Sequence, residues 1–200
     1  MEKEQGIIQG IADGDRKAMR LLYEQLAGYA MAVAIRYLPH VEDAKDVVHD
    51  SFIKAFSHIH DFNYRGDGSL RAWMTKIVTN EAINALRKTS RLTFVSDIPD
   101  EPDDDPPDVE TVPPEEITRM IGLLPPGYRA VFNLFVFEQK SHKQIAAMLG
   151  IKENSSASQY LRAKSMLKKL INEYQQTRHD KARLDPKPEV ETVRLSGTRA

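Results

Sequence analysis

Along most of this chain, apolar residues recur every three or four positions, which places them on one face of an α-helix. In the first half this pattern predicts helices over residues 5–38, 42–60 and 69–88. We expect Gly14-Asp15 to break or kink the first helix and Pro39 to end it. The side chains expected to form the core of this half are Leu22, Leu26, Tyr29, Val33, Tyr37, Val48, Phe52, Phe56, Ile59, Leu70, Trp73 and Ile77. The three helices are predicted to form one domain over residues 1–96.

Residues 141–170 are predicted to be two short helices around a tight turn, which is a helix-turn-helix. Ser141 and Gln144 have the spacing of a capping box, which marks the start of the first helix. Gly150 supplies the left-handed residue that ends this helix, with Ile151 as its hydrophobic follower. The second helix carries one apolar stripe, formed by Tyr160, Ala163, Leu167 and Leu170.

The opposite face of that second helix is polar and cationic, with Ser155, Ser158, Gln159, Arg162 and Lys169. Such a face fits a DNA major groove, whereas a plain helical hairpin would turn it to solvent. Two further helices, predicted over residues 116–123 and 126–137, complete a four-helix domain over residues 116–174. No strand pattern or internal repeat stands out, so we predict an all-α fold with two small helical domains.

Charge is distributed unevenly, although the formal net charge of the 200 residues is only −1. Residues 97–116 contain ten acids, six prolines and no base, a composition that cannot bury enough apolar surface to order itself. We therefore predict an extended acidic linker over residues 97–115, and a loose tail over residues 175–200. Residues 139–174 contain seven bases and two acids. The linker is either a solvated spacer or a tethered polyanion that competes with DNA for this basic region.

Several functional classes are excluded by what the sequence lacks. The absence of cysteine excludes disulfides, thiolate metal sites and cysteine nucleophiles. His58 and His60 are two positions apart on a predicted helix and point in different directions, which makes a poor metal pair. No glycine-rich phosphate loop or calcium loop occurs, so we expect no cofactor, no metal and no enzymatic activity. The longest uncharged run, residues 25–35, is too short to cross a bilayer, and the segment MEKEQG lacks the apolar core expected of a signal peptide. We therefore expect a cytoplasmic protein without membrane insertion.

Three segments, taken in order, resemble the extracytoplasmic-function (ECF) class of the sigma-70 family of bacterial RNA polymerase sigma factors. They are EDAKDVVHDSFIKAF at residues 42–56, YRGDGSLRAWMTKIVTNEAINALRK at residues 64–88, and LPPGYRAVFNLFVFEQKSHKQIAAMLGI at residues 124–151. The resemblance implies a protein that directs core polymerase to promoters by recognising −35 and −10 elements and melting the DNA. The alternative is a free-standing helix-turn-helix regulator, which would usually dimerise on a palindrome and would not need residues 64–88.

The resemblance also implies a role for each region. The largest-subunit coiled coil of core polymerase would be bound by Asp46, His49, Asp50 and Phe52. The −10 element would be bound by Tyr64, Arg65, Lys76, Asn80, Asn84, Arg87 and Lys88. The −35 element would be bound by Ser155, Ser158, Gln159, Arg162, Lys164 and Lys169. An anti-sigma factor is the other partner that the family implies.

Four residues depart from the family pattern. His49 replaces the usual Gln, Ala157 a usual basic residue, Ser156 a buried Val, and Lys152 a capping Ser. The departure at His49 predicts a polymerase contact that is weaker or pH-sensitive. The other three predict an altered −35 preference and a second helix that is held less firmly than usual.

Overall fold

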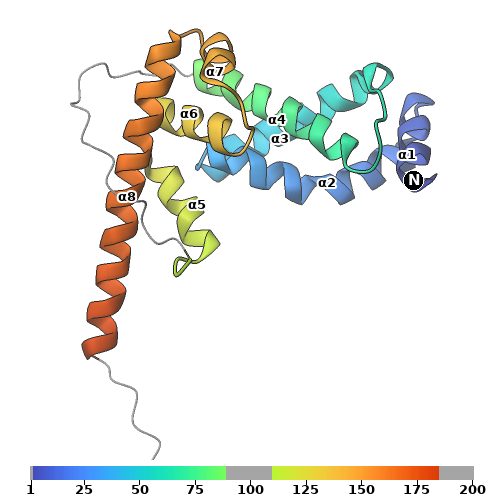
Figure 1. The fold of residues 1–200 in the computed structure, drawn as a ribbon. Coiled ribbons are helices and arrows are strands. Elements are labelled where there is room, and N and C mark those ends of the chain that lie inside the picture. Colours follow the sequence, from blue (N-terminus) through green and yellow to red (C-terminus); the bar gives the residue numbers. More distant parts are fainter. Residues whose placement is uncertain (1, 89–109, 185–200) are drawn as a thin grey trace, which may run out of the picture.

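The computed structural model describes residues 2–88 and 110–184, and within these ranges it is helical without any strand (Figure 1). The predicted all-α fold is therefore confirmed for this part of the chain. The elements of the first half are α1 (Glu2–Ala12), α2 (Arg16–Tyr37), α3 (Val41–Ser57), the short 3-10 helix η1 (Ile59–Asp61) and α4 (Ser69–Lys88). Those of the second half are α5 (Pro114–Leu123), α6 (Pro126–Val136), α7 (His142–Leu149) and α8 (Glu153–Leu184). Most of the predicted linker, residues 97–109, lies outside the described residues.

The break predicted near the N-terminus is present and separates α1 from α2. Gly14 has φ 79°, in the left-handed region that glycine adopts without strain. Asp15 then caps α2, because its carboxylate accepts a hydrogen bond of 2.8 Å from the backbone N–H of Lys17. Residues 2–88 consequently form four α-helices, where three were predicted for this half.

The core of the first half follows the predicted stripes, with two aromatic side chains at its edge. Tyr29 is half-buried, and its hydroxyl donates to Thr75 Oγ1 over 2.9 Å, which joins α2 to α4. Trp73 is also half-buried, and its ring centroid lies 5.1 Å from that of Phe62. The remaining predicted core residues are buried except for Phe56 and Ile77, which are half-buried.

The helix-turn-helix forms through the local signals that predicted it. Ser141 Oγ accepts from the backbone N–H of Gln144, and the Gln144 side chain accepts from the backbone N–H of Ser141. Gly150 ends α7 with φ 69°, and the N–H of Ile151 donates back to the carbonyl of Ala146 over 3.0 Å. Both ends of α7 are thus closed by the residues expected.

The C-terminal helix is longer than predicted. α8 continues to Leu184, so the loose tail expected from residue 175 is wrong for its first ten residues. No glycine or proline occurs between residue 151 and Pro186, so nothing in the sequence stops the helix. This part of α8 is also held from outside, because Gln175 Nε2 donates to Thr111 Oγ1 over 3.0 Å and Arg178 Nη1 donates to the Thr111 carbonyl over 3.2 Å. No helix of the described residues is long and apolar enough to cross a membrane.

The two halves of the chain pack against each other rather than standing apart (Figure 1). One buried cluster runs from α1–α4 into α6 and α7, where it includes Ala130, Val131, Leu134, Ile145 and Leu149. A second, smaller cluster joins α5 and α6 to α8 through Met120, Leu124, Tyr128, Ala163 and Leu167. The second half therefore has one apolar face for its own core and another that is buried against the first half.

Candidate nucleic-acid interface

The outer face of α3 carries the residues expected to bind a protein partner. Asp46, His49 and Asp50 are exposed on it. Phe52 is only 2% exposed and packs against Tyr23 with ring centroids 4.7 Å apart. The prediction that Phe52 offers its ring to a partner is therefore wrong, since one step along a helix turns a side chain by about 100°. The exposed apolar side chain on this face is Ile53, which is 54% exposed and lies four residues after His49.

The seven residues predicted to bind the −10 element fall on different surfaces. Asn84 and Lys88 line a hollow of about 240 Å³ between α4 and α3, together with Asp43, Asp46 and Asp50. The edge of this hollow is fixed by an ion pair, in which Lys54 Nζ lies 2.7 Å from Glu81 Oε1. These two predicted DNA contacts thus lie beside the acids of α3.

Lys76 and Asn80 lie on another side of α4, where both are exposed. They line a groove of about 390 Å³ with Tyr29, Ala72, Thr75 and Thr79 of the first half and with Glu138, Lys140 and Met148 of the second. Arg87, near the end of α4, donates to the backbone carbonyl of Met148. Part of the predicted −10 surface is thus shared with the second half of the chain.

The loop between η1 and α4 presents the remaining two −10 candidates. Tyr64 is half-buried, and its hydroxyl donates to Asp67 Oδ1 over 2.9 Å. The Arg65 side chain is exposed, while its backbone N–H donates to Ser69 Oγ over 3.3 Å. Gly66 and Gly68 have φ 103° and 87°, conformations in which a larger side chain would be strained. The loop therefore holds the Tyr64 ring and the Arg65 cation near the N-terminal end of α4.

The start of α8 carries the predicted −35 candidates. Lys169 is exposed, and the half-buried candidates are Ser155, Ser158, Arg162 and Lys164. Gln159 is only 2% exposed, so its prediction as an outward reader of DNA is wrong. It stands three residues after the buried Ser156 and four before the buried Ala163, which places it on the inward stripe.

The serine at the centre of the helix-turn-helix has a partner that the sequence did not reveal. Ser156 is fully buried, and its Oγ lies 3.0 Å from His142 Nδ1. The His142 ring stacks on Phe135, with centroids 4.7 Å apart and planes 14° apart. A polar group at this apolar position is therefore satisfied by a hydrogen bond across the turn. This contact joins the second helix to α7. That the helix is held less firmly than usual stays a prediction.

Comparison with known proteins matches both halves of this arrangement. The family description "Sigma-70 region 2" matches residues 22–92, and "Sigma-70, region 4" matches residues 114–167. The chain is 26% identical over 186 residues to the RNA polymerase sigma-H factor of Pseudomonas aeruginosa, covering 85% of this chain and 94% of that one. It is 28% identical over 183 residues to the ECF RNA polymerase sigma-E factor of Haemophilus influenzae, covering 84% and 95%.

The chain belongs to the ECF class of the sigma-70 family. As a sigma factor, it directs RNA polymerase to promoters, and the alternative of a free-standing regulator is not favoured. A solved complex of the sigma factor RpoE with the anti-sigma factor NepR, from Bartonella quintana, is similar with a TM-score of 0.48 and 21% identity, covering 78% of this chain and 98% of that one. In this sigma factor, α1 and the distal part of α8 lie outside both family descriptions.

Proposed function

We propose that this sigma factor binds core polymerase through the outer face of α3. We call Asp46, His49, Asp50 and Ile53 the docking face. All four side chains are exposed, and they combine acids with one large apolar group. A coiled coil that presents basic and apolar side chains would match this face in both charge and hydrophobicity. The exposure of Ile53 beside these acids is the observation that carries the assignment.

We assign −10 recognition to the exposed side of α4 and to the loop before it. Reading an unpaired strand requires a flat ring for stacking, an amide for the edge of an extruded base and cations for phosphates. Tyr64 supplies the ring, Asn80 the amide, and Arg65 and Lys76 the cations. The other −10 candidates, which would meet DNA at the far edge or the end of α4, are Asn84, Arg87 and Lys88.

We assign −35 recognition to the start of α8. Ser155, Ser158 and Arg162 would meet base edges in the major groove, because they occupy the N-terminal turns of the second helix of the helix-turn-helix. Lys164 and Lys169 would meet phosphates, which fixes the helix on the duplex without reading its sequence. Gln159 is left out of this set because it is buried.

The polymerase, rather than this chain, performs the chemistry of transcription. The sigma factor contributes binding energy and selects the site, so we assign it no catalytic residue. It would act in the cytoplasm, where bacterial transcription takes place, and an anti-sigma factor is the regulatory partner that we propose.

The docking face can be tested by reversing one charge. Asp46→Arg should weaken the binding of core polymerase about tenfold or more, because it sets a positive charge against a basic partner surface. A tenfold rise in Kd corresponds to a loss of about 1.4 kcal/mol of binding free energy. Asp13→Arg is the matched control, since it makes the same charge change at an exposed position of the α1–α2 turn. Ile53→Ala should weaken binding as well through loss of an apolar contact. Titration of labelled protein with core polymerase measures all three, and equal affinity of Asp46→Arg and wild type would disprove the assignment.

A further inference from the structure

The groove along α4, beside Lys76 and Asn80, has the size and the lining of a binding site. Its volume is about 390 Å³, and ligand sites in proteins have volumes of about 300–1,000 Å³. The residues of the first half that line it are Tyr29, Ala72, Thr75, Lys76, Thr79 and Asn80. All of them lie on α2 or α4, so the first half alone forms one wall of the groove. This wall combines an aromatic ring, a cation and an amide.

The helical spacing of α4 places its side chains together on this wall. Residues four apart lie on one face of a helix. Ala72, Lys76 and Asn80 form one row of this kind. Thr75 and Thr79 form a second row beside it. Thr79 is only 3% exposed, whereas Lys76 and Asn80 are exposed. The wall therefore offers a cation and an amide to a molecule that enters the groove.

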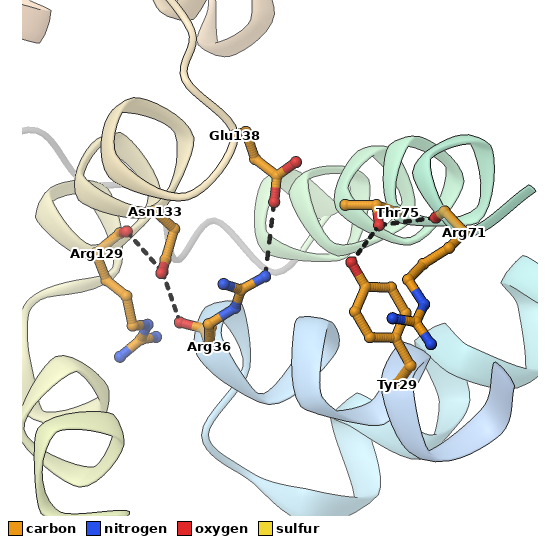
Figure 2. Close-up of polar contacts among 7 residues, drawn as sticks. All are labelled: Tyr29, Arg36, Arg71, Thr75, Arg129, Asn133 and Glu138. Atoms are coloured by element: carbon orange, nitrogen blue, oxygen red, sulfur yellow. Dashed lines mark hydrogen bonds and ion pairs between the residues drawn. The ribbon is translucent and has the colours of Figure 1, made fainter. Parts of the chain in front are cut away.

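Tyr29 of α2 supplies the ring, and contacts with α4 hold it in place. Its hydroxyl donates to Thr75 Oγ1 over 2.9 Å, and Thr75 Oγ1 donates in turn to the carbonyl of Arg71 over 2.9 Å (Figure 2). The guanidinium carbon of Arg71 lies 4.8 Å from the centroid of the Tyr29 ring, which is a cation–π contact. The ring is half-buried and lines the groove, so it is held and accessible at the same time. Stacking on a nucleobase requires such a ring.

Tyr64 and Asn80 lie too far apart along α4 to hold the same base. The helix begins at Ser69, and Asn80 follows eleven residues later, which is about 16 Å along the axis at about 1.5 Å per residue. Tyr64 precedes the helix and is held there by its hydrogen bond to Asp67. A base at Asn80 therefore needs another stacking partner. Tyr29 is placed to provide it, because it lines the same groove as Asn80.

We propose that this groove is a second base-binding site, in which Tyr29 stacks on one nucleobase of the unpaired promoter strand and Asn80 reads the edge of that base. This inference rests on the proposed function and adds a site to it, because one base is held at Tyr64 and another at Tyr29. Lys76 lies one turn before Asn80, so it is placed to contact the phosphate of the same nucleotide.

The two side chains contribute differently to recognition in this site. Stacking tolerates any sequence, since every base has a π-face, whereas an amide discriminates among base edges. Tyr29 therefore contributes affinity, and Asn80 contributes the preference for one base.

Single abasic sites test whether a base occupies the groove. The probe is a promoter duplex selected from a randomised library by the wild-type holoenzyme. Its −10 region is unpaired, and its non-template strand lacks one base at a time. Removal of a stacked base should weaken the binding of wild-type holoenzyme about fivefold or more. In Tyr29→Leu one position should lose this penalty while the others keep it, and in Tyr64→Leu a different position should lose it.

Tyr29→Phe is the matched control, because it keeps the ring but lacks the hydroxyl that donates to Thr75. It should keep the abasic penalty at every position, since stacking needs only the ring. If Tyr29 served packing alone, Tyr29→Leu would change the affinity for all probes alike and leave the position-dependent penalties unchanged. Asn80→Ala should instead reduce the preference among the four bases at the position assigned to Tyr29.

Each outcome decides one point. Unchanged penalties in Tyr29→Leu would overturn the second site, and so would loss of the same position in Tyr29→Leu and Tyr64→Leu. Failure of the wild-type holoenzyme to bind any promoter would instead refute the proposed function. Photo-cross-linking of the wild-type protein covers the case in which Tyr29→Leu does not fold. With 5-iodouracil at each −10 position in turn, one position should cross-link to the peptide that contains Tyr29, and no cross-link to that peptide at any position would overturn the site.

Discussion

Replacing Arg129 of α6 with methionine removes a buried cation that joins the ends of α2 and α5, while it keeps most of the apolar stem. The variant loses three hydrogen bonds to backbone carbonyls, those of Tyr37, Gly122 and Leu124. None of these carbonyls can find a donor in a thioether, which is at most a weak acceptor. Arg129→Met should therefore destabilise the fold through the polar groups that it leaves behind.

The size of the effect follows from the burial of these groups. A hydrogen bond from a charged donor contributes about 1.5–3 kcal/mol, and an orphaned buried acceptor costs about 1–3 kcal/mol. Two contributions reduce the sum: water can reach carbonyls near helix ends, and the buried guanidinium no longer carries a desolvation cost. We expect a net loss of about 3 kcal/mol, or a fall in Tm of about 6–12 °C for a chain of this size.

Thermal unfolding followed by circular dichroism measures this change, with Arg119→Met as the matched control. Arg119 lies on α5, its side chain is 56% exposed, and its Nε lies 2.8 Å from Glu116 Oε2. An exposed pair of this kind contributes about 0.2–1 kcal/mol, so Arg119→Met should lower Tm by less than about 4 °C. If both variants lower Tm equally, Arg129 does not contribute the stability derived from its three hydrogen bonds.

Three further predictions concern DNA and pH. Asn80→Ala should shrink the permanganate-reactive bubble at a promoter without weakening the closed complex, because the base is extruded only on melting; an unaltered bubble would count against the assignment. Arg162→Ala should reduce the discrimination among −35 sequences by about 1–3 kcal/mol. Lys169→Ala should weaken binding to every sequence alike and reduce the slope of log K against log salt concentration by about one. Identical behaviour of the two variants across a −35 library would contradict these roles. Burial raises the pKa of Glu138 above its usual value, against the lowering effects of Arg36 and Lys140. The folded state therefore binds a proton at Glu138 more readily than the unfolded state does, so Tm should rise as pH falls through the raised pKa. A series of thermal melts from pH 7 downward measures the dependence of Tm on pH, which should be weaker in Glu138→Gln.

Features that depend on a few neighbouring residues could be predicted from the sequence. The start and end of α7 follow from Ser141, Gln144 and Gly150, because the donors and acceptors involved lie within one turn. The predicted end of α8 is too early because its distal residues are polar, although polar residues without glycine or proline continue a helix readily. The contacts of this distal part with Thr111 were not visible in any periodic pattern.

Features that depend on which way one side chain turns were harder to predict. Phe52 and Ile53 are adjacent, and helical geometry places one inside and the other outside. Gln159 was assigned outward because it is polar, yet its register makes it inward. Arg129 lies in one of the three segments that carry the family resemblance, but its role as a helix cap could not be predicted. Its partner at Tyr37 is a backbone carbonyl 92 residues away, and backbone acceptors leave no trace in residue type.

The end of α2 is capped from α6, because Asn133 Nδ2 donates to the carbonyl of Arg36 (Figure 2) and Arg129 Nε donates to that of Tyr37. This shared cap has a consequence for how the chain can be divided. Family descriptions and the acidic segment both suggest a cut between residues 96 and 116. A fragment ending there would leave the carbonyls of Arg36 and Tyr37 to water, and its counterpart would expose Val131 and Leu134. Each half is thus an incomplete folding unit, and each carries an apolar face that is buried in the intact chain. Studies of isolated halves would measure the solubility and self-association of that face along with any affinity for promoter or polymerase.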